Sequence, residues 1–306
     1  MKSLNVKFID GGECARAIVL RALSFDYEVR EGDTPSVVFF SDDKLAKHKA
    51  FRDCLKIYVA IEYNYPNYGL CDYSLGFLPL STSKNLRLPV YTWEDKGSEL
   101  VKGENEWKNV IQSKDKFCAF VVSNGNKNRT WKRISFFHKL SNYKRIDSGG
   151  SFLNNVGHRV DDKLAFYKPY KFVLTFENQK NPWYTTEKLV HAMLSRCVPI
   201  YWGNSRIAED FNPKSFINVG DFKNDEEAIQ YIMKVDEDLA LFEKYIKEPF
   251  FYGNKPNEFF NIERLRNFLS HAIEGPRNRR EFFGYIPFKL LDIKKRIQPY
   301  YEKVLR

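Results

Sequence analysis

A chain of 306 residues can bury a sizeable core and is long enough for two domains. Hydrophobic residues make up 43% of it and charged residues 29%, which is ordinary for a soluble globular protein. The net charge of +10 favours anionic partners such as nucleotides, nucleic acid or a membrane surface.

The five cysteines are scattered without CxxC spacing, which argues against a disulfide framework or a zinc site. Cys118 and Cys197 lie in apolar runs and are expected to be buried. Arg16 and Arg21 interrupt the N-terminal stretch, which therefore does not look like a signal peptide. No run approaches the roughly 20 apolar residues of a membrane helix. We therefore expect a cytoplasmic protein.

Short apolar runs alternate with helical patterns in the first third of the chain. The predicted strands span 4–10, 36–41, 55–62, 73–77 and 87–92, and a helical period covers 13–25. This order predicts an α/β domain with a largely parallel sheet. The polar segment 95–116 has no strand signal, so we place the first domain at 1–115.

A second unit repeats the order of strand and helix. Predicted strands at 116–124, 170–178 and 198–203 alternate with predicted helices at 129–143, 185–197 and 225–246. We predict a second Rossmann-like, doubly wound domain over 116–275, facing the first across a cleft. Residues 276–306 form a basic, aromatic C-terminal tail.

Polar groups gather where the strand 170–178 gives way to the following helix. Thr185 or Thr186 can cap that helix and leave free N–H groups at its start. Lys188 falls in the first turn, where a positive charge is unfavourable against the helix dipole. A phosphate in front of the helix would explain this lysine, and a plain cap with a solvent-facing lysine is the alternative.

The segment 170–222 carries Phe-Glu-Asn at 176–178, Thr-Glu-Lys at 186–188, VPIYWG at 198–203 and FNPKSFINV at 211–219. In this order and spacing it resembles the donor-binding core of the α-1,3-fucosyltransferases, glycosyltransferase family 10. Residues 58–77 and 145–155 also resemble bacterial members, so the likeness reaches from about residue 57 to 222.

The resemblance implies a GT-B-type fold and GDP-fucose as the donor. It implies transfer of L-fucose, with inversion, to an N-acetylglucosamine hydroxyl of a lactosamine-type glycan, forming an α-1,3 or also an α-1,4 linkage. The products would be Lewis-type structures on a surface glycan, with the acceptor free or lipid-linked. No cofactor is expected to be required, although Mn²⁺ could stimulate the reaction through the diphosphate.

The resemblance also assigns residue roles. Glu62 matches the general base that takes the acceptor hydroxyl's proton. Arg133 matches the arginine that holds the diphosphate, with Arg129 as a competitor because the preceding loop is longer here. Lys188 is the second diphosphate cation.

The remaining expected donor contacts lie around the same strand end. Glu187 is expected to accept hydrogen bonds from ribose hydroxyls, and Tyr184 and Asn178 to contact the diphosphate or fucose. Thr186 belongs to the same donor-binding set. Glu177 could contact the fucose, stabilise the transition state or only brace the loop.

Other functions have weaker support. Asp236-Glu237-Asp238 is the only string like a metal-binding Asp-x-Asp pair, and we interpret it as a solvated helix face. Glu187 and His191 lack a third metal ligand. No nucleic-acid-binding motif is present, and a non-catalytic glycan-binding module would not need the Arg and Lys set. A different acceptor or nucleotide-sugar donor stays open. So does the choice between membrane contact and domain packing for the tail.

Overall fold

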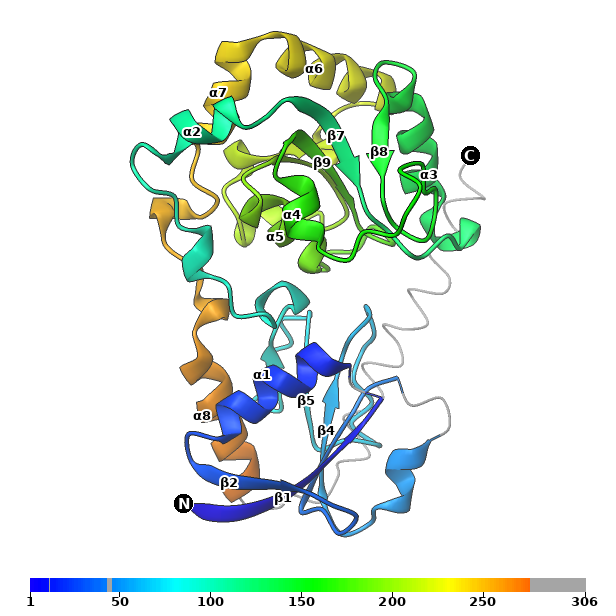
Figure 1. Ribbon diagram of the computed structural model, residues 1–306. Helices are drawn as coiled ribbons and strands as arrows, with labels where there is room; N and C mark the ends of the chain where they lie inside the picture. The colour runs from blue at the N-terminus through cyan, green and yellow to red at the C-terminus, as the bar shows by residue number, and fades with distance from the viewer. Residues whose placement is uncertain (11, 43–45, 276–306) are drawn as a thin grey trace. The chain divides into compact units, whose positions relative to one another are not determined.

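The computed structural model describes residues 1–10, 12–42 and 46–275, without the side chains of 127–129 (Figure 1). The chain divides into two compact units. One consists of Met1–Glu94 together with the described residues from Asn261 onward, and the other of Asp95–Phe260. These limits differ from the boundaries expected at 115 and 275. The tail 276–306 and its expected roles lie outside the described residues.

The first domain is built on a six-stranded parallel sheet. Its strands are β1 (Lys2–Ile9), β2 (Tyr27–Glu31), β3 (Val37–Phe40), β4 (Leu55–Val59), β5 (Tyr73–Gly76) and β6 (Asn85–Arg87). Their order is β2-β1-β3-β4-β5-β6, and every pairing is parallel. The chain therefore reverses its direction of winding between β1 and β3, as in doubly wound folds.

One local prediction for this domain is wrong, and one strand was not predicted. The strand expected at 87–92 ends at Arg87, and Val90–Thr92 forms a 3₁₀ helix after Pro89, which has no N–H to donate to a sheet. The strand Tyr27–Glu31 was missed because it is a polar edge strand, with only Tyr27 buried.

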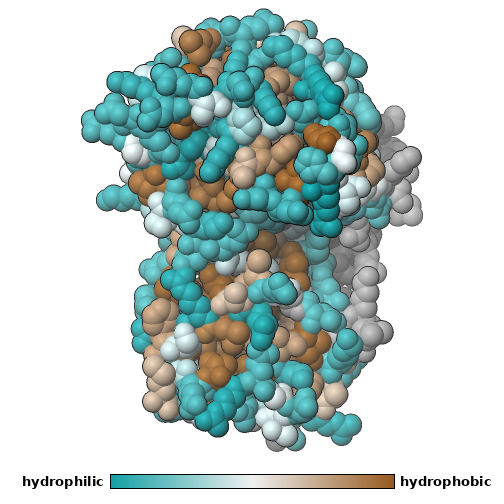
Figure 2. Space-filling view, in the orientation of Figure 1, coloured by the Kyte–Doolittle hydropathy of each residue, from teal (hydrophilic) through white to brown (hydrophobic). Residues whose placement is uncertain are grey.

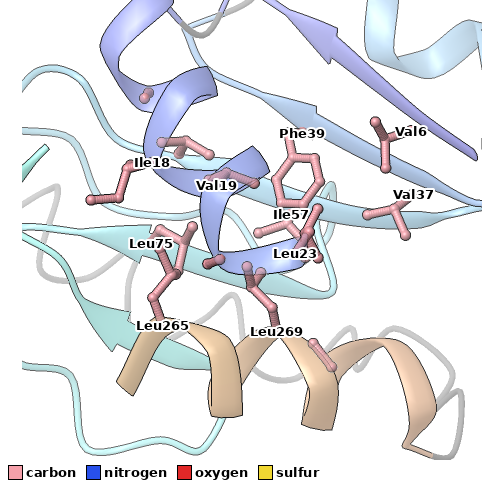
Figure 3. Packing of buried hydrophobic residues seen from close by; sticks show 14 of the residues in the cluster. Val6, Ile18, Val19, Leu23, Val37, Phe39, Ile57, Leu75, Leu265 and Leu269 are labelled. Atoms are coloured by element: carbon pink, nitrogen blue, oxygen red, sulfur yellow. The ribbon is translucent and has the colours of Figure 1, made fainter. Parts of the chain in front are cut away.

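The helix α8 (Ile262–Glu274) belongs to the first domain because of its apolar face. Its residues Leu265 and Leu269 pack into the core that α1 (Glu13–Leu23) and the sheet build, as Figure 3 shows. Arg266, on the same helix, forms a two-pronged ion pair with Asp26 in the turn after α1. The chain thus returns to its first domain after completing the second.

The second domain has a five-stranded parallel sheet in the order β11-β10-β9-β7-β8. Its strands are β7 (Lys116–Phe120), β8 (Ile146–Ser148), β9 (Tyr170–Phe176), β10 (Val198–Trp202) and β11 (Ile217–Asn218). Its helices are α2 (Glu106–Gln112), α3 (Lys127–Ser141), α4 (Lys163–Tyr167), α5 (Glu187–Leu194), α6 (Asp225–Glu237) and α7 (Leu239–Lys247).

Helices cover both faces of this sheet, because alternate side chains of a strand point to opposite sides. Cys118 and Phe120 of β7 pack into the core formed with α3, α6 and α7. Ala119 between them packs toward α4 and α5, beside Ala192 and Cys197. The predicted α/β class, with two Rossmann-like domains, is confirmed.

The predicted helix 225–246 is two helices, since Asp238 breaks the run and caps α7 by accepting from the Leu241 N–H. The prediction of a solvated face at 236–238 is wrong for Asp236, whose carboxylate is buried and pairs with Lys144 and Lys171. Asp236 therefore belongs to a packed ion-pair network with Lys144 and Lys171.

Among the described helices, none combines the length and apolar character needed to cross a membrane. On the face shown in Figure 2, hydrophilic side chains cover most of each domain and the hydrophobic patches between them are discontinuous.

Candidate donor-binding site

The switch point of the second sheet lies between β7 and β9, where the strand order reverses. Ligands of open α/β sheets bind beside the carboxyl ends of the strands at such a point. Asn124 follows β7 there, and Glu177 and Asn178 follow β9. The polar cluster predicted from the sequence therefore falls at the position that the topology favours for a ligand.

Arg133 reaches this point from α3 and joins the two loops. Its Nη2 donates to the carbonyl of Asn124 at 2.6 Å, and its Nη1 donates to Asn178 Oδ1 at 3.1 Å. The residue is only 1% exposed, and its Nε has no hydrogen-bond partner among the described atoms. Burial lowers the pKa of Arg133, and the nearby Glu177 partly opposes this shift. The fork that was expected to hold phosphate oxygens is thus engaged with the protein.

Glu177 is completely buried, with 0% exposure. Its Oε1 accepts from the Thr186 N–H at 2.7 Å, and its Oε2 accepts from the Thr186 hydroxyl at 2.8 Å and from Lys188 Nζ at 3.3 Å. Burial raises the pKa of the Glu177 carboxyl, and Lys188 and the Thr186 N–H offset this in part. Of the roles left open for Glu177, this geometry favours bracing over contact with the donor.

Lys188 keeps 21% of its side chain exposed. Nζ donates to Thr186 Oγ1 at 2.8 Å and lies 3.8 Å from Glu187 Oε1. Burial lowers the pKa of Lys188, but the carboxylates of Glu177 and Glu187 outweigh this effect and the net shift is upward. These two carboxylates also offset the unfavourable interaction of Lys188 with the helix dipole. They are therefore a second explanation, besides a bound phosphate, for a lysine in the first turn.

The residue expected to cap α5 is in place, but its side chain does not cap the helix. Thr186 is the N-cap residue, but its side chain makes no capping hydrogen bond and binds Glu177 instead. The Thr186 side chain therefore leaves the first N–H groups of the helix uncapped, although the Glu187 N–H bonds to the carboxylate of its own residue. Glu187 follows in the first turn with a third of its side chain exposed. Burial raises its pKa, and Lys188 and the backbone N–H of Glu187 itself reverse the shift to a net lowering.

Of the other expected donor contacts, Asn178 is half-buried and held by Arg133, and Tyr184 is buried. The side chain of Arg129, the competitor of Arg133, lies outside the described residues. Glu177 and Asn178 directly follow β9, and Arg133, Thr186 and Lys188 each contact one of these two residues. Glu187 begins the helix α5.

Sequence reasoning missed Asn204, which fixes the loop before α5. Its Oδ1 accepts from the N–H groups of Trp183 at 2.5 Å and Arg206 at 2.8 Å, and its Nδ2 donates to Thr185 Oγ1 at 3.1 Å. Trp183 has a positive φ of 60°, which a bulky residue adopts only when its surroundings hold it there. The only sequence signal was an asparagine directly after the strand VPIYWG.

Two glycines allow the close packing on which the site depends. A Cβ on Gly203 would stand 2.5 Å from Glu177 Cγ, so only glycine leaves room for the buried carboxylate. A Cβ on Gly150 would stand 1.9 Å from the carbonyl oxygen of Val122. The sequence Asp-Ser-Gly-Gly at 147–150 therefore serves close approach between two segments of the protein.

Glu62, the predicted base, lies in the first domain. It is half-buried in the bend that follows β4, at the carboxyl end of that strand, as expected. Its carbonyl accepts from the Asn64 N–H at 2.7 Å, and the Asn64 amide donates to both carboxylate oxygens of Asp42 after β3. The backbone of Glu62 is thus tied to the neighbouring strand end.

No group of three or more His, Cys, Asp or Glu side chains arranged for a metal ion occurs within the described ranges. The cations near the switch point are side chains of the protein itself, namely Arg133 and Lys188.

Two parallel α/β domains, one with cationic side chains at its switch point, are the architecture of the GT-B class of glycosyltransferases. Sequence profiles agree with this class. Residues 111–264 match the profile described as "Glycosyltransferase family 10 (fucosyltransferase) C-term", and residues 5–93 match "Alpha-(1,3)-fucosyltransferase FucT N-terminal domain". The chain belongs to glycosyltransferase family 10, the fucosyltransferases.

Individual proteins resemble the chain over different lengths. Alpha-(1,3)-fucosyltransferase FucT of Helicobacter pylori is 33% identical over an alignment of 217 residues, which covers 60% of this chain and 44% of that protein. The 3-galactosyl-N-acetylglucosaminide 4-alpha-L-fucosyltransferase of Bos taurus is 36% identical over 140 residues, 45% of this chain and 37% of that protein. The chain therefore spans less than half the length of these relatives.

Among solved structures, an alpha1,3-fucosyltransferase with GDP-fucose superposes with a TM-score of 0.74. The two are 25% identical, and the match covers 92% of this chain and 93% of the other. The likeness in structure thus extends through both domains.

Proposed function

We propose that this protein transfers L-fucose from GDP-fucose to an N-acetylglucosamine hydroxyl of a lactosamine-type glycan and forms an α-1,3 linkage. The observation that carries the proposal is the pairing of Lys188 with a helix start at the switch point of the second sheet. Such a site suits the diphosphate of a nucleotide sugar. The structural relative that holds GDP-fucose supports this choice of donor.

The proposed reaction is a single displacement with inversion. The acceptor oxygen forms a bond to the anomeric carbon of fucose while the bond from that carbon to the phosphate oxygen breaks. The electron pair leaves with GDP, and the hydroxyl proton passes to the Glu62 carboxylate. Lys188 stabilises the charge that develops on the departing diphosphate, because Thr186 holds its ammonium at the start of α5.

The exposure of Glu187 and Asn178 supports their proposed contacts with the donor. Glu187 is exposed enough to accept hydrogen bonds from ribose hydroxyls, and Asn178 lies half-exposed beside Arg133. Arg133 contributes its positive charge from behind the two loops. No step requires a metal ion, although Mn²⁺ bound to the diphosphate would stabilise the same leaving group.

The proposal also specifies the linkage that is formed and the acceptor that is used. The name of the H. pylori relative specifies α-1,3 transfer, whereas that of the bovine relative specifies α-1,4 transfer to a 3-galactosylated N-acetylglucosamine. We favour α-1,3 transfer because the structural relative that covers both domains also carries that specificity. Products of this kind would be Lewis-type structures on a surface glycan.

The direct test incubates the purified chain with GDP-fucose and either a type 1 or a type 2 lactosamine disaccharide, with EDTA or Mn²⁺. Linkage analysis of the product should show α-1,3 fucose on the type 2 acceptor. Fucose at the 4-position of the type 1 acceptor would instead support the second specificity. GDP binding without turnover of any acceptor would point to a non-catalytic protein, and activity only with another nucleotide sugar would refute the donor.

A further inference from the structure

We propose that Glu177 is a positioning residue that fixes the Lys188 ammonium for the diphosphate without contacting the donor itself. The inference rests on the proposed function, because it concerns how the same site recognises a nucleoside diphosphate. It assigns to Glu177 one definite role among those that the sequence left open.

Glu177 and Lys188 differ in their exposure to solvent. Glu177 has no exposed surface, and both of its carboxylate oxygens are occupied by Thr186 and Lys188. Lys188 retains a fifth of its side-chain exposure. Lys188 therefore offers a ligand at the switch point some side-chain surface, whereas Glu177 offers none.

The Thr186 hydroxyl completes the arrangement. It donates its single proton to Glu177 Oε2 at 2.8 Å, which turns an oxygen lone pair toward Lys188 Nζ, also at 2.8 Å. The ammonium thus has two acceptors on one side, Glu177 Oε2 and Thr186 Oγ1. An ammonium has three N–H donors, so one remains for a ligand oxygen after these two bonds are made.

The position of Glu177 is itself set by the sheet. Its N–H donates to the Trp202 carbonyl at 2.8 Å, which continues the pairing of β9 with β10. Gly203 leaves just enough room for the Glu177 side chain. The carboxylate is therefore a fixed anchor built on two strands, and a lysine on such an anchor loses little side-chain entropy when a phosphate binds.

If Glu177 acted only through its charge, its removal would change the affinity for GDP in the opposite direction. If the carboxylate only neutralised Lys188, its loss would leave a more positive site and GDP would bind more tightly. If it positions Lys188, its loss frees the ammonium from its anchor and GDP binds more weakly. The sign of the change in GDP affinity therefore separates the two roles.

The experiment compares GDP and GMP binding by isothermal titration calorimetry for the wild type and Glu177→Gln. We expect roughly a 10- to 100-fold loss of GDP affinity, the size of one or two charge-assisted contacts. GMP lacks the second phosphate, so its affinity should change by less than about threefold. Equal or tighter GDP binding by Glu177→Gln would overturn the proposal, and so would an equal loss for GMP.

A matched control is Asp236→Asn. Asp236 is also a buried carboxylate in this domain with two lysine partners, Lys144 and Lys171, but it lies on α6 and outside the proposed site. Both variants lose a buried charge, so both should lower the melting temperature. Only Glu177→Gln should lose GDP affinity, and a similar loss in Asp236→Asn would trace the effect to general destabilisation.

A second pair of variants decides the question even if Glu177→Gln fails to fold. Thr186→Val keeps the shape of the side chain but removes the hydroxyl, whereas Thr186→Ser restores the hydroxyl. GDP affinity should fall in the first and recover in the second, with GMP affinity little changed in both. Wild-type levels of GDP binding in Thr186→Val would contradict the proposed anchor, whereas a wild type that binds no GDP would instead refute the proposed function.

Discussion

Asn178 Oδ1 accepts a hydrogen bond from the Arg133 guanidinium at 3.1 Å, and this contact links β9 to α3 across the switch point of the second sheet. The other prong of the guanidinium holds the Asn124 carbonyl after β7. One side chain therefore fixes both loops that border the proposed donor site and places a positive charge behind them.

Replacing Arg133 with Ala should weaken GDP binding by roughly 10- to 100-fold, because a charged group and two hydrogen bonds are lost together. Arg133→Lys keeps the charge but not the fork, so it should recover only part of the affinity. Calorimetric titration with GDP measures both effects. Lys139→Ala on the same helix is the control, since that lysine pairs with Asp225 and Glu226 on α6. Its variant should bind GDP normally, and unchanged binding in Arg133→Ala would exclude Arg133 from the site.

Glu62→Gln tests the proposed base separately from donor binding. Turnover should fall on the order of 10²- to 10⁴-fold, because glutamine cannot take the hydroxyl proton. GDP affinity should stay at the wild-type level, since the predicted donor residues all belong to the second domain. Initial rates at saturating GDP-fucose, measured beside GDP titrations, give both quantities. A variant with normal turnover would remove Glu62 from the mechanism.

Lys102 should make the stability of the second domain depend on pH. Burial lowers the pKa of Lys102 to about 7, with a further contribution from the charge of Arg196. Its ammonium donates to the carbonyls of Ile246 and Glu248 and lies 3.9 Å from the centre of the Phe250 ring. Between this pKa and the ordinary lysine value of about 10.5, the unfolded chain binds the extra proton, so the free energy of unfolding should rise with pH.

Urea unfolding of the wild type and Lys102→Met at pH 7, 8 and 9 measures this dependence. The wild type should gain stability over the interval, and the gain should be smaller in Lys102→Met. Parallel curves for the two proteins would show that Lys102 does not titrate in this range.

Gly150→Ala should destabilise the second domain by about 1–3 kcal/mol, because the new methyl group collides with the Val122 backbone, which cannot move aside cheaply. Gly103→Ala is the matched change in the same domain, since its Cβ would meet only ordinary contacts, at 3.7 Å or more. Thermal unfolding should show a clear drop in melting temperature for the first variant and little change for the second. Similar melting temperatures would mean that the loop at 147–150 can rearrange.

Much of the candidate site could be predicted because it depends on the order of strands and helices. Apolar periodicity located β7, β9, β10 and α5, and the polar residues after β9 then had to lie at one end of a parallel sheet. The resemblance to the fucosyltransferases added the expected roles of Glu62, Arg133 and Lys188, which remain proposals.

By itself, the sequence determined two α/β units, their strands and the polar cluster that begins at Glu177, since these follow from local patterns. Only the tertiary structure decided that Glu177 is buried against Thr186 and Lys188, that Asn204 ties down the preceding loop, and that α8 returns to the first domain. Hydrogen bonds and packing between distant segments depend on strand register and on the space left by residues such as Gly203, which periodicity and charge do not encode.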